Sequence, residues 1–164
     1  YTDNPHSTCL TLALPRRATG EDAPAVAEVW LRSRRASVPA IPAPVHADEE
    51  VRAWLAERVA GDEVWVLDDG DAVVALLVLG LDEVDQLYVD PDHTGRGLGT
   101  LLMAVAKGRR PDGLVLWTFA ANEGARRFYA RHGFVEVGGT DGDNEEGAPD
   151  VRLRWAGRTA TVPG

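Results

Sequence analysis

The chain has 164 residues, 45% of them apolar and 26% charged, with a formal net charge of −9. This length and composition predict one domain with a sizeable core, and the acidic balance argues against non-specific binding to nucleic acid or anionic lipid. The single cysteine, Cys9, excludes an intrachain disulfide, and no apolar run approaches the roughly 20 residues that cross a bilayer. The start of the chain has no signal-peptide pattern, so we expect a cytoplasmic protein with a loose tail over residues 1–8 and one domain over 9–164.

The first half of the chain predicts a strand, a helix, an extended loop, a second helix and two hairpin strands. In chain order these elements cover residues 8–14, 22–35, 38–45, 48–61, 63–67 and 72–79. Thr19 and Asp22 resemble a capping box ahead of the first helix, and three prolines keep the loop extended. Asp48 is expected to cap the second helix, and Asp69-Gly70 is typical of a hairpin turn.

The second half alternates strands and helices. It predicts a strand, a helix, a strand, a helix and two final strands at residues 84–89, 98–107, 114–119, 122–132, 134–137 and 151–155. The helix between the strands at 84–89 and 114–119 indicates a parallel crossover, because antiparallel neighbours need only a short turn. The order of elements therefore predicts a mixed α/β sheet.

The most informative stretch is VDQLYVDPDHTGRGLGT, residues 84–100, in which three glycines stand between a strand and a helix. Backbone N–H groups and the helix dipole converge at such a junction, which predicts an anion site, most often for phosphate. A P-loop is excluded because no lysine follows the glycines, and the G-x-G-x-G spacing disfavours a dinucleotide-binding fold. A tight turn whose glycines serve only packing is the alternative interpretation.

A second segment, N-x-x-A-x-x-F-Y-x-x-x-G-F at residues 122–134, lies one strand and one helix further on. Together with L-Y-V-D-P and T-G-R-G-L-G, it resembles the GNAT superfamily of N-acetyltransferases over a core of about residues 83–137. The resemblance implies a single acetyltransferase domain with a mixed, mostly antiparallel central sheet flanked by helices. In that fold the strands at 84–89 and 114–119 form a splayed parallel pair. The chain departs from the family at Thr94, where Gln or Arg is common.

The resemblance implies that acetyl-CoA lies between the two splayed strands, with no metal. The backbone of strand 84–89 would pair with the pantetheine arm, and the amides of the glycine loop would hold the pyrophosphate. The implied cofactor-binding residues are Leu87, Tyr88, Val89, Thr94, Gly95, Arg96, Gly97, Leu98, Gly99, Thr100, Asn122 and Arg126. Asn122 also fits a plain helix N-cap, and Arg96 also fits an exposed arginine without a role.

The resemblance gives Tyr129 the role of general acid, which protonates the leaving thiolate of coenzyme A. The N–H of Val89 is the candidate donor to the oxyanion that forms when the thioester is attacked. An amine must be neutral to attack, so a base has to take its proton directly or through water.

The base is less well defined than the acid. Glu83 and Asp85 are the first candidates, because the family often places a carboxylate in this region. Strand alternation predicts that Asp85, Leu87 and Val89 share one face. His46 is a further candidate, with an exposed loop residue as the alternative reading.

The expected activity is transfer of an acetyl group from acetyl-CoA to a primary amine by direct attack. An acyl-CoA sensor without turnover is the alternative, because no clear base stands out, and a nucleotide-binding regulatory domain is a third reading. The acidic balance favours a small-molecule amine over a protein amine, and dimers are common in the family, so a homodimer is a further expectation. The acidic stretch 140–150 fails the calcium-loop pattern, which leaves a solvated turn, the preferred reading, or an acidic rim for a cationic acceptor.

Overall fold

A computed structural model of the chain describes residues 14–158, and within it the strands form two separate antiparallel sheets. The first sheet has the order β1-β2-β3-β4, with β1 (Arg16–Arg17), β2 (Glu63–Asp69), β3 (Ala72–Leu79) and β4 (Val84–Val89). The second has the order β5-β7-β6, with β5 (Leu114–Phe119), β6 (Val135–Thr140) and β7 (Asp150–Trp155). The tail expected at 1–8, and nearly all of the strand expected at 8–14, lie outside the described residues.

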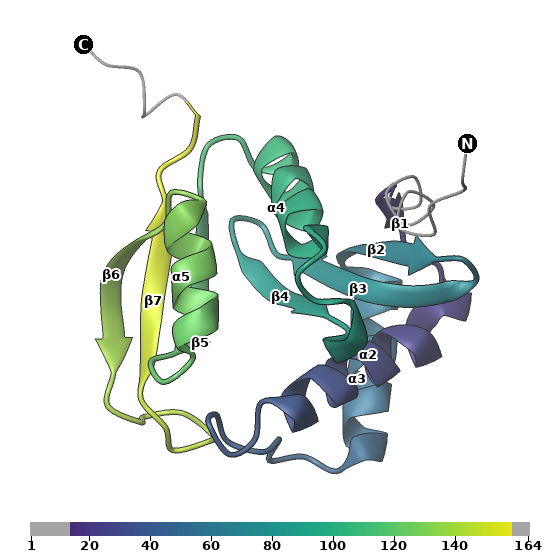
Figure 1. The fold of residues 1–164 in the computed structure, drawn as a ribbon, viewed down its shortest axis with the longest axis horizontal. Helices are drawn as coiled ribbons and strands as arrows, with labels where there is room; N and C mark the ends of the chain where they lie inside the picture. Colours follow the sequence, from purple (N-terminus) through teal and green to yellow (C-terminus); the bar gives the residue numbers. More distant parts are fainter. Residues whose placement is uncertain (1–13, 159–164) are drawn as a thin grey trace, which may run out of the picture.

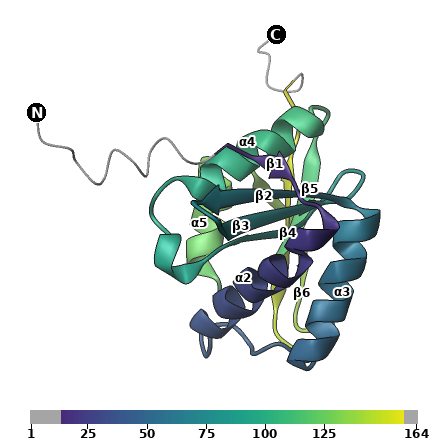
Figure 2. The same cartoon turned by 90° about the vertical axis from the view of Figure 1, so that its right-hand side faces the viewer.

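Four α-helices and two short 3₁₀ turns complete the described fold. They are α2 (Ala23–Ala36), α3 (Asp48–Gly61), α4 (Leu98–Arg109), α5 (Glu123–Arg131), η1 (Gly20–Asp22) and η2 (Pro91–His93). Helices α2 and α3 cover one face of the first sheet and α4 covers the other, as Figures 1 and 2 show. None of the described helices is both long enough and apolar enough to cross a membrane.

The two sheets meet through the predicted parallel pair. Glu83 forms a single parallel bridge with Val115, and the Val115 N–H donates to the Asp82 carbonyl at 2.8 Å. Beyond this bridge β4 pairs only with β3 and β5 only with β7, so the two strands diverge (Figure 1). The splayed parallel pair and the mostly antiparallel strand pairing are confirmed.

Strand β3 forms the centre of the core because it is buried on both faces. Leu76 and Val78 pack with α2 and α3, whereas Leu77 and Leu79 pack with α4 and the second sheet. The unbroken apolar run of β3 follows from this double burial, because a strand with one wet face would alternate apolar and polar residues. The core therefore fixes the position of β4, which is paired to β3 along its length.

Two helix starts differ slightly from the prediction. The Asp22 carboxylate accepts the Thr19 backbone N–H at 2.7 Å, as the capping box predicts, but Asp22 lies in η1 and α2 begins one residue later. The expectation that Asp48 caps the second helix is wrong: the cap is Ala47, whose N–H donates to the Glu50 carboxylate at 3.1 Å. Asp48 instead pairs with Arg35 of α2.

The hairpin turn also lies one residue later than predicted. Asp69 pairs with Ala72, so the two turn residues are Gly70 and Asp71, with Gly70 at φ +63°. Gly70 is thus the first of the two turn residues, and its positive φ is one that such a hairpin turn requires.

A bulge in β4 changes the direction of one predicted site residue. Val78 pairs with Gln86 while Leu79 pairs with Val84, so Asp85 is the extra residue. The expectation that Asp85 shares a face with Leu87 and Val89 is therefore wrong. Those two residues pack toward the second sheet, whereas the Asp85 carboxylate contacts Arg58 on α3.

Candidate functional site

Two cavities lie side by side where β4 and β5 diverge. The first, of about 750 Å³, is called the large cavity, and the second, of about 480 Å³ and extending along β4 toward the start of α4, is called the small cavity. Residues that line both are Ile41, Leu87, Tyr88, Asn122, Ala125 and Tyr129. The shared lining residues show that the two cavities are next to each other.

The glycine loop at the small cavity leaves backbone donors free of helix partners. Gly97 is the N-cap of α4 with φ +79°, and the first hydrogen bond within the helix runs from the Leu101 N–H to the Gly97 carbonyl at 3.1 Å. The N–H groups of residues 98–100 therefore have no acceptor inside the helix. With the dipole of α4 behind them, these amides have the geometry that the predicted anion site requires.

Gly99 has a packing role as well. A Cβ at this position would lie 3.2 Å from the ring of Phe128 on α5, which is tighter than ordinary van der Waals contact. The packing reading of the glycines thus holds for Gly99, and it keeps α5 close to the loop that carries the anion site.

Replacing Gly97 with Ala is expected to destabilise the fold by about 1 kcal/mol, because a side chain is strained at positive φ even though no atom lies within 4 Å of the new Cβ. Gly108, the last residue but one of α4 with open space around it, is the matched control: Gly108→Ala should stabilise by about 0.5 kcal/mol. Urea unfolding of both variants measures the difference, and equal effects of the two substitutions would contradict the strain at Gly97.

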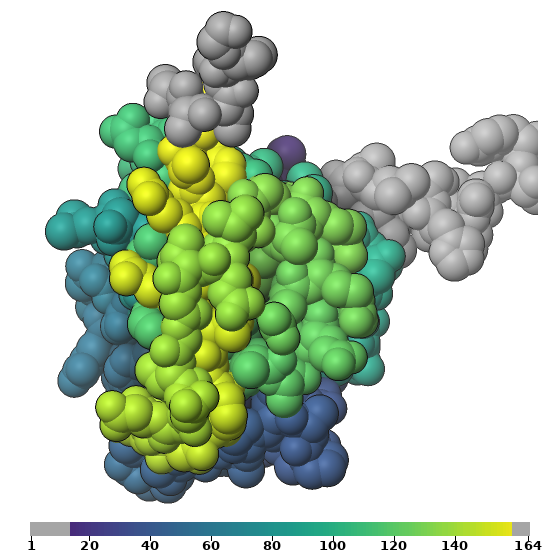
Figure 3. Space-filling model, turned by 90° about the vertical axis from the view of Figure 1, so that its left-hand side faces the viewer, coloured from purple at the N-terminus to yellow at the C-terminus, as the bar shows by residue number. Residues whose placement is uncertain are grey.

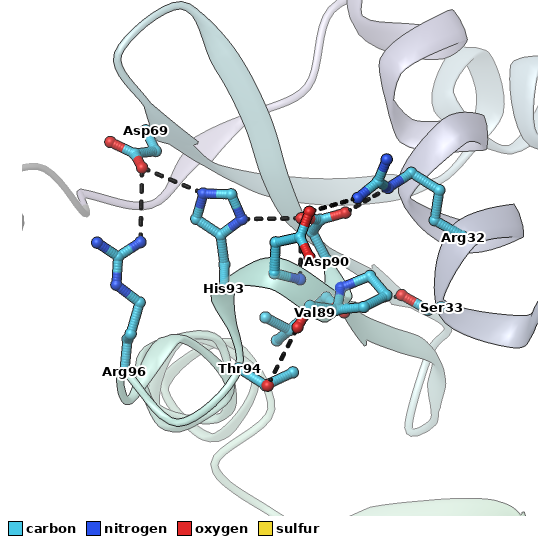
Figure 4. A network of polar contacts seen from close by, with 10 residues as sticks. Arg32, Ser33, Asp69, Val89, Asp90, His93, Thr94 and Arg96 are labelled. Atoms are coloured by element: carbon cyan, nitrogen blue, oxygen red, sulfur yellow. Dashed lines mark hydrogen bonds and ion pairs between the residues drawn. The ribbon is translucent and has the colours of Figure 1, made fainter. Parts of the chain in front are cut away.

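A network of polar contacts holds the chain just before the glycine loop (Figure 4). The His93 ring lies between two carboxylates, with Nδ1 2.8 Å from Asp90 and Nε2 3.2 Å from Asp69. Arg32 of α2 donates to the buried Asp90 at 2.7 Å, and Arg96 lies 3.5 Å from Asp69. These contacts fix the entry to the anion site before any ligand binds, and they hold Arg96 toward the β2–β3 turn.

The backbone of β4 presents only alternate residues to the small cavity. The Asp90 N–H donates to the Val74 carbonyl of β3 at 2.7 Å. Because backbone direction alternates along a strand, the amides of Leu87 and Val89 face away from β3, whereas those of Tyr88 face toward it. The sequence predicts that all three residues offer backbone groups to a ligand, but only those of Leu87 and Val89 face the small cavity. Tyr88 lines both cavities.

Asn122 and Tyr129 lie on α5 at the wall between the cavities. The Asn122 side-chain oxygen accepts the Ala125 N–H at 3.1 Å, so the predicted N-cap is present. Tyr129 is buried between the rings of Phe128 and Phe134, at centroid distances of 5.3 and 5.6 Å. Burial raises the pKa of Tyr129 well above its usual range, so its hydroxyl stays protonated at neutral pH.

The two candidate carboxylate bases have different surroundings. Asp85 lines the large cavity and contacts Arg58; burial raises its pKa, although the charge of Arg58 opposes the shift. Glu83 lines neither cavity, and its pKa is raised mainly by burial and then by the charges of Asp85 and Asp82. Only Asp85 is therefore placed to meet a ligand directly.

His46 and the loop between β6 and β7 form the outer rim of the large cavity. His46 is exposed, with Nε2 3.1 Å from Glu145 and Nδ1 3.5 Å from Glu50. The hydrogen bond and charge of Glu145, then those of Glu50, raise the pKa of His46, which favours the protonated form that cannot accept a proton. Figure 3 shows this loop against the segment between α2 and α3, and Glu145 and Glu146 line the cavity, so the acidic-rim reading fits better than a solvated turn.

The structure brings most, though not all, of the predicted residues together. Those that line the small cavity are Leu87, Tyr88, Val89, Thr94, Gly99, Asn122 and Tyr129. Gly95, Arg96, Gly97, Leu98 and Thr100 lie beside it in the loop and first turn of α4. Arg126 does not line either cavity, because its guanidinium donates to the Ala120 carbonyl at 3.1 Å and lies 3.2 Å from Glu136.

Two residues of α2 at the site were missed by sequence reasoning. The Ser33 hydroxyl donates to the Val89 carbonyl at 2.8 Å, and Arg34 lines the large cavity. Neither belongs to a motif. The one signal for Arg34 was its position four residues after Trp30, on the helix face that the apolar spacing predicts to be buried.

Comparisons with known proteins agree with this geometry. Residues 60–136 match the acetyltransferase (GNAT) domain family. The chain is 30% identical over 132 residues to peptidyl-lysine N-acetyltransferase YjaB of Escherichia coli K12, covering 79% of this chain and 86% of the relative. The solution structure of apo YjaB from Escherichia coli superposes with a TM-score of 0.73 at 25% identity, covering 90% of this chain and 99% of that one. The PaiA N-acetyltransferase of Thermoplasma acidophilum, solved with coenzyme A, shares the fold with a TM-score of 0.64 at 17% identity, covering 88% and 98%.

Proposed function

Because this chain belongs to the GNAT superfamily and is an acyl-CoA-dependent N-acyltransferase, we propose that it moves an acetyl group from acetyl-CoA to a primary amine. The observation that carries the proposal is the position of Tyr129, a protonated hydroxyl on the wall shared by the two cavities. A donor in the small cavity and an acceptor in the large cavity would meet beside it.

The small cavity suits the donor. The outward amides of Leu87 and Val89 would pair with the pantetheine arm as an added strand would. The free amides at the start of α4 would hold the pyrophosphate, with Thr94 and the glycines at the loop. Asn122 uses its side-chain oxygen for the cap, which leaves its NH₂ group as the donor for a pantetheine carbonyl.

The transfer then follows from these groups. The neutral amine attacks the thioester carbon, and the oxyanion accepts a hydrogen bond from the Val89 N–H. As the C–S bond breaks, the Tyr129 hydroxyl gives its proton to the sulfur. The proton lost by the amine goes to Asp85 or, through water, to Glu83, and solvent returns a proton to Tyr129.

A small-molecule amine is the first candidate acceptor. The large cavity has aromatic walls and an acidic rim, which suit a cationic amine that is enclosed on several sides. A lysine side chain of a peptide is the second candidate, since the relative YjaB is named a peptidyl-lysine N-acetyltransferase. A homodimer and a cytoplasmic location stay predictions from the sequence.

The test is thiol release from acetyl-CoA in the presence of a panel of amines that includes free amino acids, polyamines and lysine peptides. We expect at least one amine to release coenzyme A in proportion to acetylated product, identified by mass spectrometry. Binding of acetyl-CoA by calorimetry without turnover on any amine would favour the sensor reading instead. No binding of acetyl-CoA at all would overturn the proposal.

A further inference from the structure

Arg34 is a buried cation in the wall of the large cavity. Its residue is 5% exposed, and one guanidinium nitrogen, Nη2, donates to the Pro42 carbonyl at 3.1 Å. The guanidinium lies 5.1 Å from the ring centre of Trp30 and 5.6 Å from that of Phe119. Among the described residues no carboxylate lies within ion-pair distance of Arg34, and its Nε is buried without a hydrogen-bond partner.

Such an arrangement is costly for a side chain with only a structural role. Arginine is rarely buried unless it is paired, because removing its charge from water is unfavourable. Two ring faces, the Pro42 carbonyl and the hydroxyl of Tyr88 offset part of that cost. The planar guanidinium has five N–H donors whose fork matches a carboxylate, and the described residues do not use all of them. Arg34 also lines the large cavity, so an acceptor there would lie beside this cation.

The other ionised groups of the large cavity are already partnered, with one exception. The partnered groups are Asp85 with Arg58, His46 with Glu50 and Glu145, and Asp150 with Thr140 and Asn144. Glu146 is the exception, being half-buried with no ion pair in residues 14–158. The cavity therefore offers one unpaired cation and one unpaired anion.

Both unpaired groups lie near the hydroxyl of Tyr88. Burial is the main cause of the raised pKa of Tyr88; the charge and hydrogen bond of Arg34 act to lower it, and the charge of Glu146 acts to raise it. Tyr88 lines both cavities, and Arg34 and Glu146 line the large one, so the two opposite charges act at the wall that the cavities share.

We propose that Arg34 binds a carboxylate of the acceptor, so that the substrate class is an aminocarboxylate, such as a free amino acid. The carboxylate accepts hydrogen bonds from the guanidinium of Arg34, and the amino end lies between Glu146 and Tyr129. This inference rests on the proposed function, because it concerns the acceptor of that reaction. A lysine inside a peptide chain lacks such a carboxylate and serves as a comparison in the test.

The first experiment needs no variant. The ligands are ω-amino acids from glycine to 6-aminohexanoate and the carboxamide of each. Every ligand is titrated by calorimetry into two samples, the protein alone and the protein saturated with coenzyme A. At one chain length we expect the carboxylate to bind about 10–100-fold tighter than its carboxamide, the range of a charge-assisted hydrogen-bonded pair. Equal binding of carboxylate and carboxamide at every length, or tighter binding of an internal-lysine peptide, overturns the inference.

Variants then locate the preference. Arg34→Gln should make the carboxylate and the carboxamide bind equally, and Arg34→Lys should keep part of the preference. Arg35→Gln is the matched control, because Arg35 is the exposed neighbour that pairs with Asp48, and it should leave the preference unchanged. A purely structural role would lower the melting temperature of Arg34→Gln while the preference persists, which also overturns the inference. If Arg34→Gln fails to fold, the wild-type series and Arg34→Lys decide.

The outcomes separate this inference from the proposed function. Binding is read without turnover, so failure to acetylate any amine would contradict the transferase proposal while the carboxylate preference could still be measured. Acetylation of amines with no preference for a carboxylate would overturn the role of Arg34 alone.

Discussion

Replacing Tyr129 with Phe is expected to lower kcat by about 10²–10⁴-fold, the usual contribution of a positioned general acid. The ring stays in place because its contacts with Phe128 and Phe134 do not involve the hydroxyl. The affinity for acetyl-CoA should therefore stay close to that of the wild type. Steady-state kinetics with the best amine, beside calorimetric binding of acetyl-CoA, separate the two effects.

A second tyrosine of the same site provides the control. Tyr88 lines both cavities, so Tyr88→Phe removes a hydroxyl from the same region without removing the proposed acid. We expect a much smaller change in kcat for this variant. A wild-type kcat in Tyr129→Phe, or equal losses in both variants, would contradict the assignment of Tyr129.

The pH profile tests the same assignment from another side. An acid must be protonated to act, so activity should fall only when the pH rises through the pKa of Tyr129. Because burial raises that pKa above the usual value near 10, no loss of activity from this group is expected up to pH 10. A basic limb centred below pH 9 that disappears in Tyr129→Phe would contradict the burial argument.

The features that the sequence predicts are those encoded within a short stretch of chain. The alternating glycines allow the positive φ angles of Gly95 and Gly97, and Asn122 is a residue type that favours a helix N-cap. Both features depend only on residues adjacent in the sequence. The run at residues 72–79 predicts a hairpin strand, and the crossover helix further on predicts the parallel pair. For these reasons the fold could be anticipated, whereas the place of the donor between the two diverging strands is implied by the resemblance to the GNAT superfamily.

The acceptor side depends on partners that are far apart in the sequence. The bulge that turns Asp85 toward Arg58 comes from the register of β4 on β3, which no local pattern records. His46 meets Glu145 across 99 residues, and this contact brings the acidic loop to the cavity. In the sequence Arg34 cannot be distinguished from an exposed arginine on a helix, and the structure is needed to show that it is buried. Charged side chains are compatible with many environments, so the structure is needed to find their partners.

The replacement of Glu63 with Gln is expected to destabilise the protein by about 2 kcal/mol at pH 7, after allowance for solvent screening. Glu63 begins β2, and its carboxylate accepts hydrogen bonds from Arg109 at 2.6 Å, from Trp65 at 2.9 Å and from Arg110 at 3.3 Å. The hydrogen bond from Arg109 is the largest cause that lowers the pKa of Glu63, to about 2. Glutamine keeps the shape but loses the charge that holds both arginines.

The pH dependence of this loss follows from the direction of the shift. The folded-state pKa of Glu63 lies below its ordinary value of 4.5, so its stabilisation is complete above about pH 4.5 and is lost as the pH falls toward about 2. The gap between wild type and Glu63→Gln should therefore be widest at neutral pH and should narrow steadily between pH 4.5 and pH 3. Urea unfolding at several pH values measures that gap.

Glu136→Gln is the control for this experiment, because Glu136 is more exposed and, among residues 14–158, its one ion pair is with Arg126. Glu63 with Arg109, Arg110 and Trp65 is called the Glu63 cluster. An equal loss of unfolding free energy in both variants, or a loss for Glu63→Gln that does not change with pH, would contradict a stabilising role of this cluster. The cluster ties the carboxyl end of α4 to the first sheet, and Arg110 extends the tie by donating to the Gly80 carbonyl at 2.9 Å. The proposed pyrophosphate site lies at the other end of the same helix, so the substitution should lower stability while the affinity of the folded protein for coenzyme A is retained.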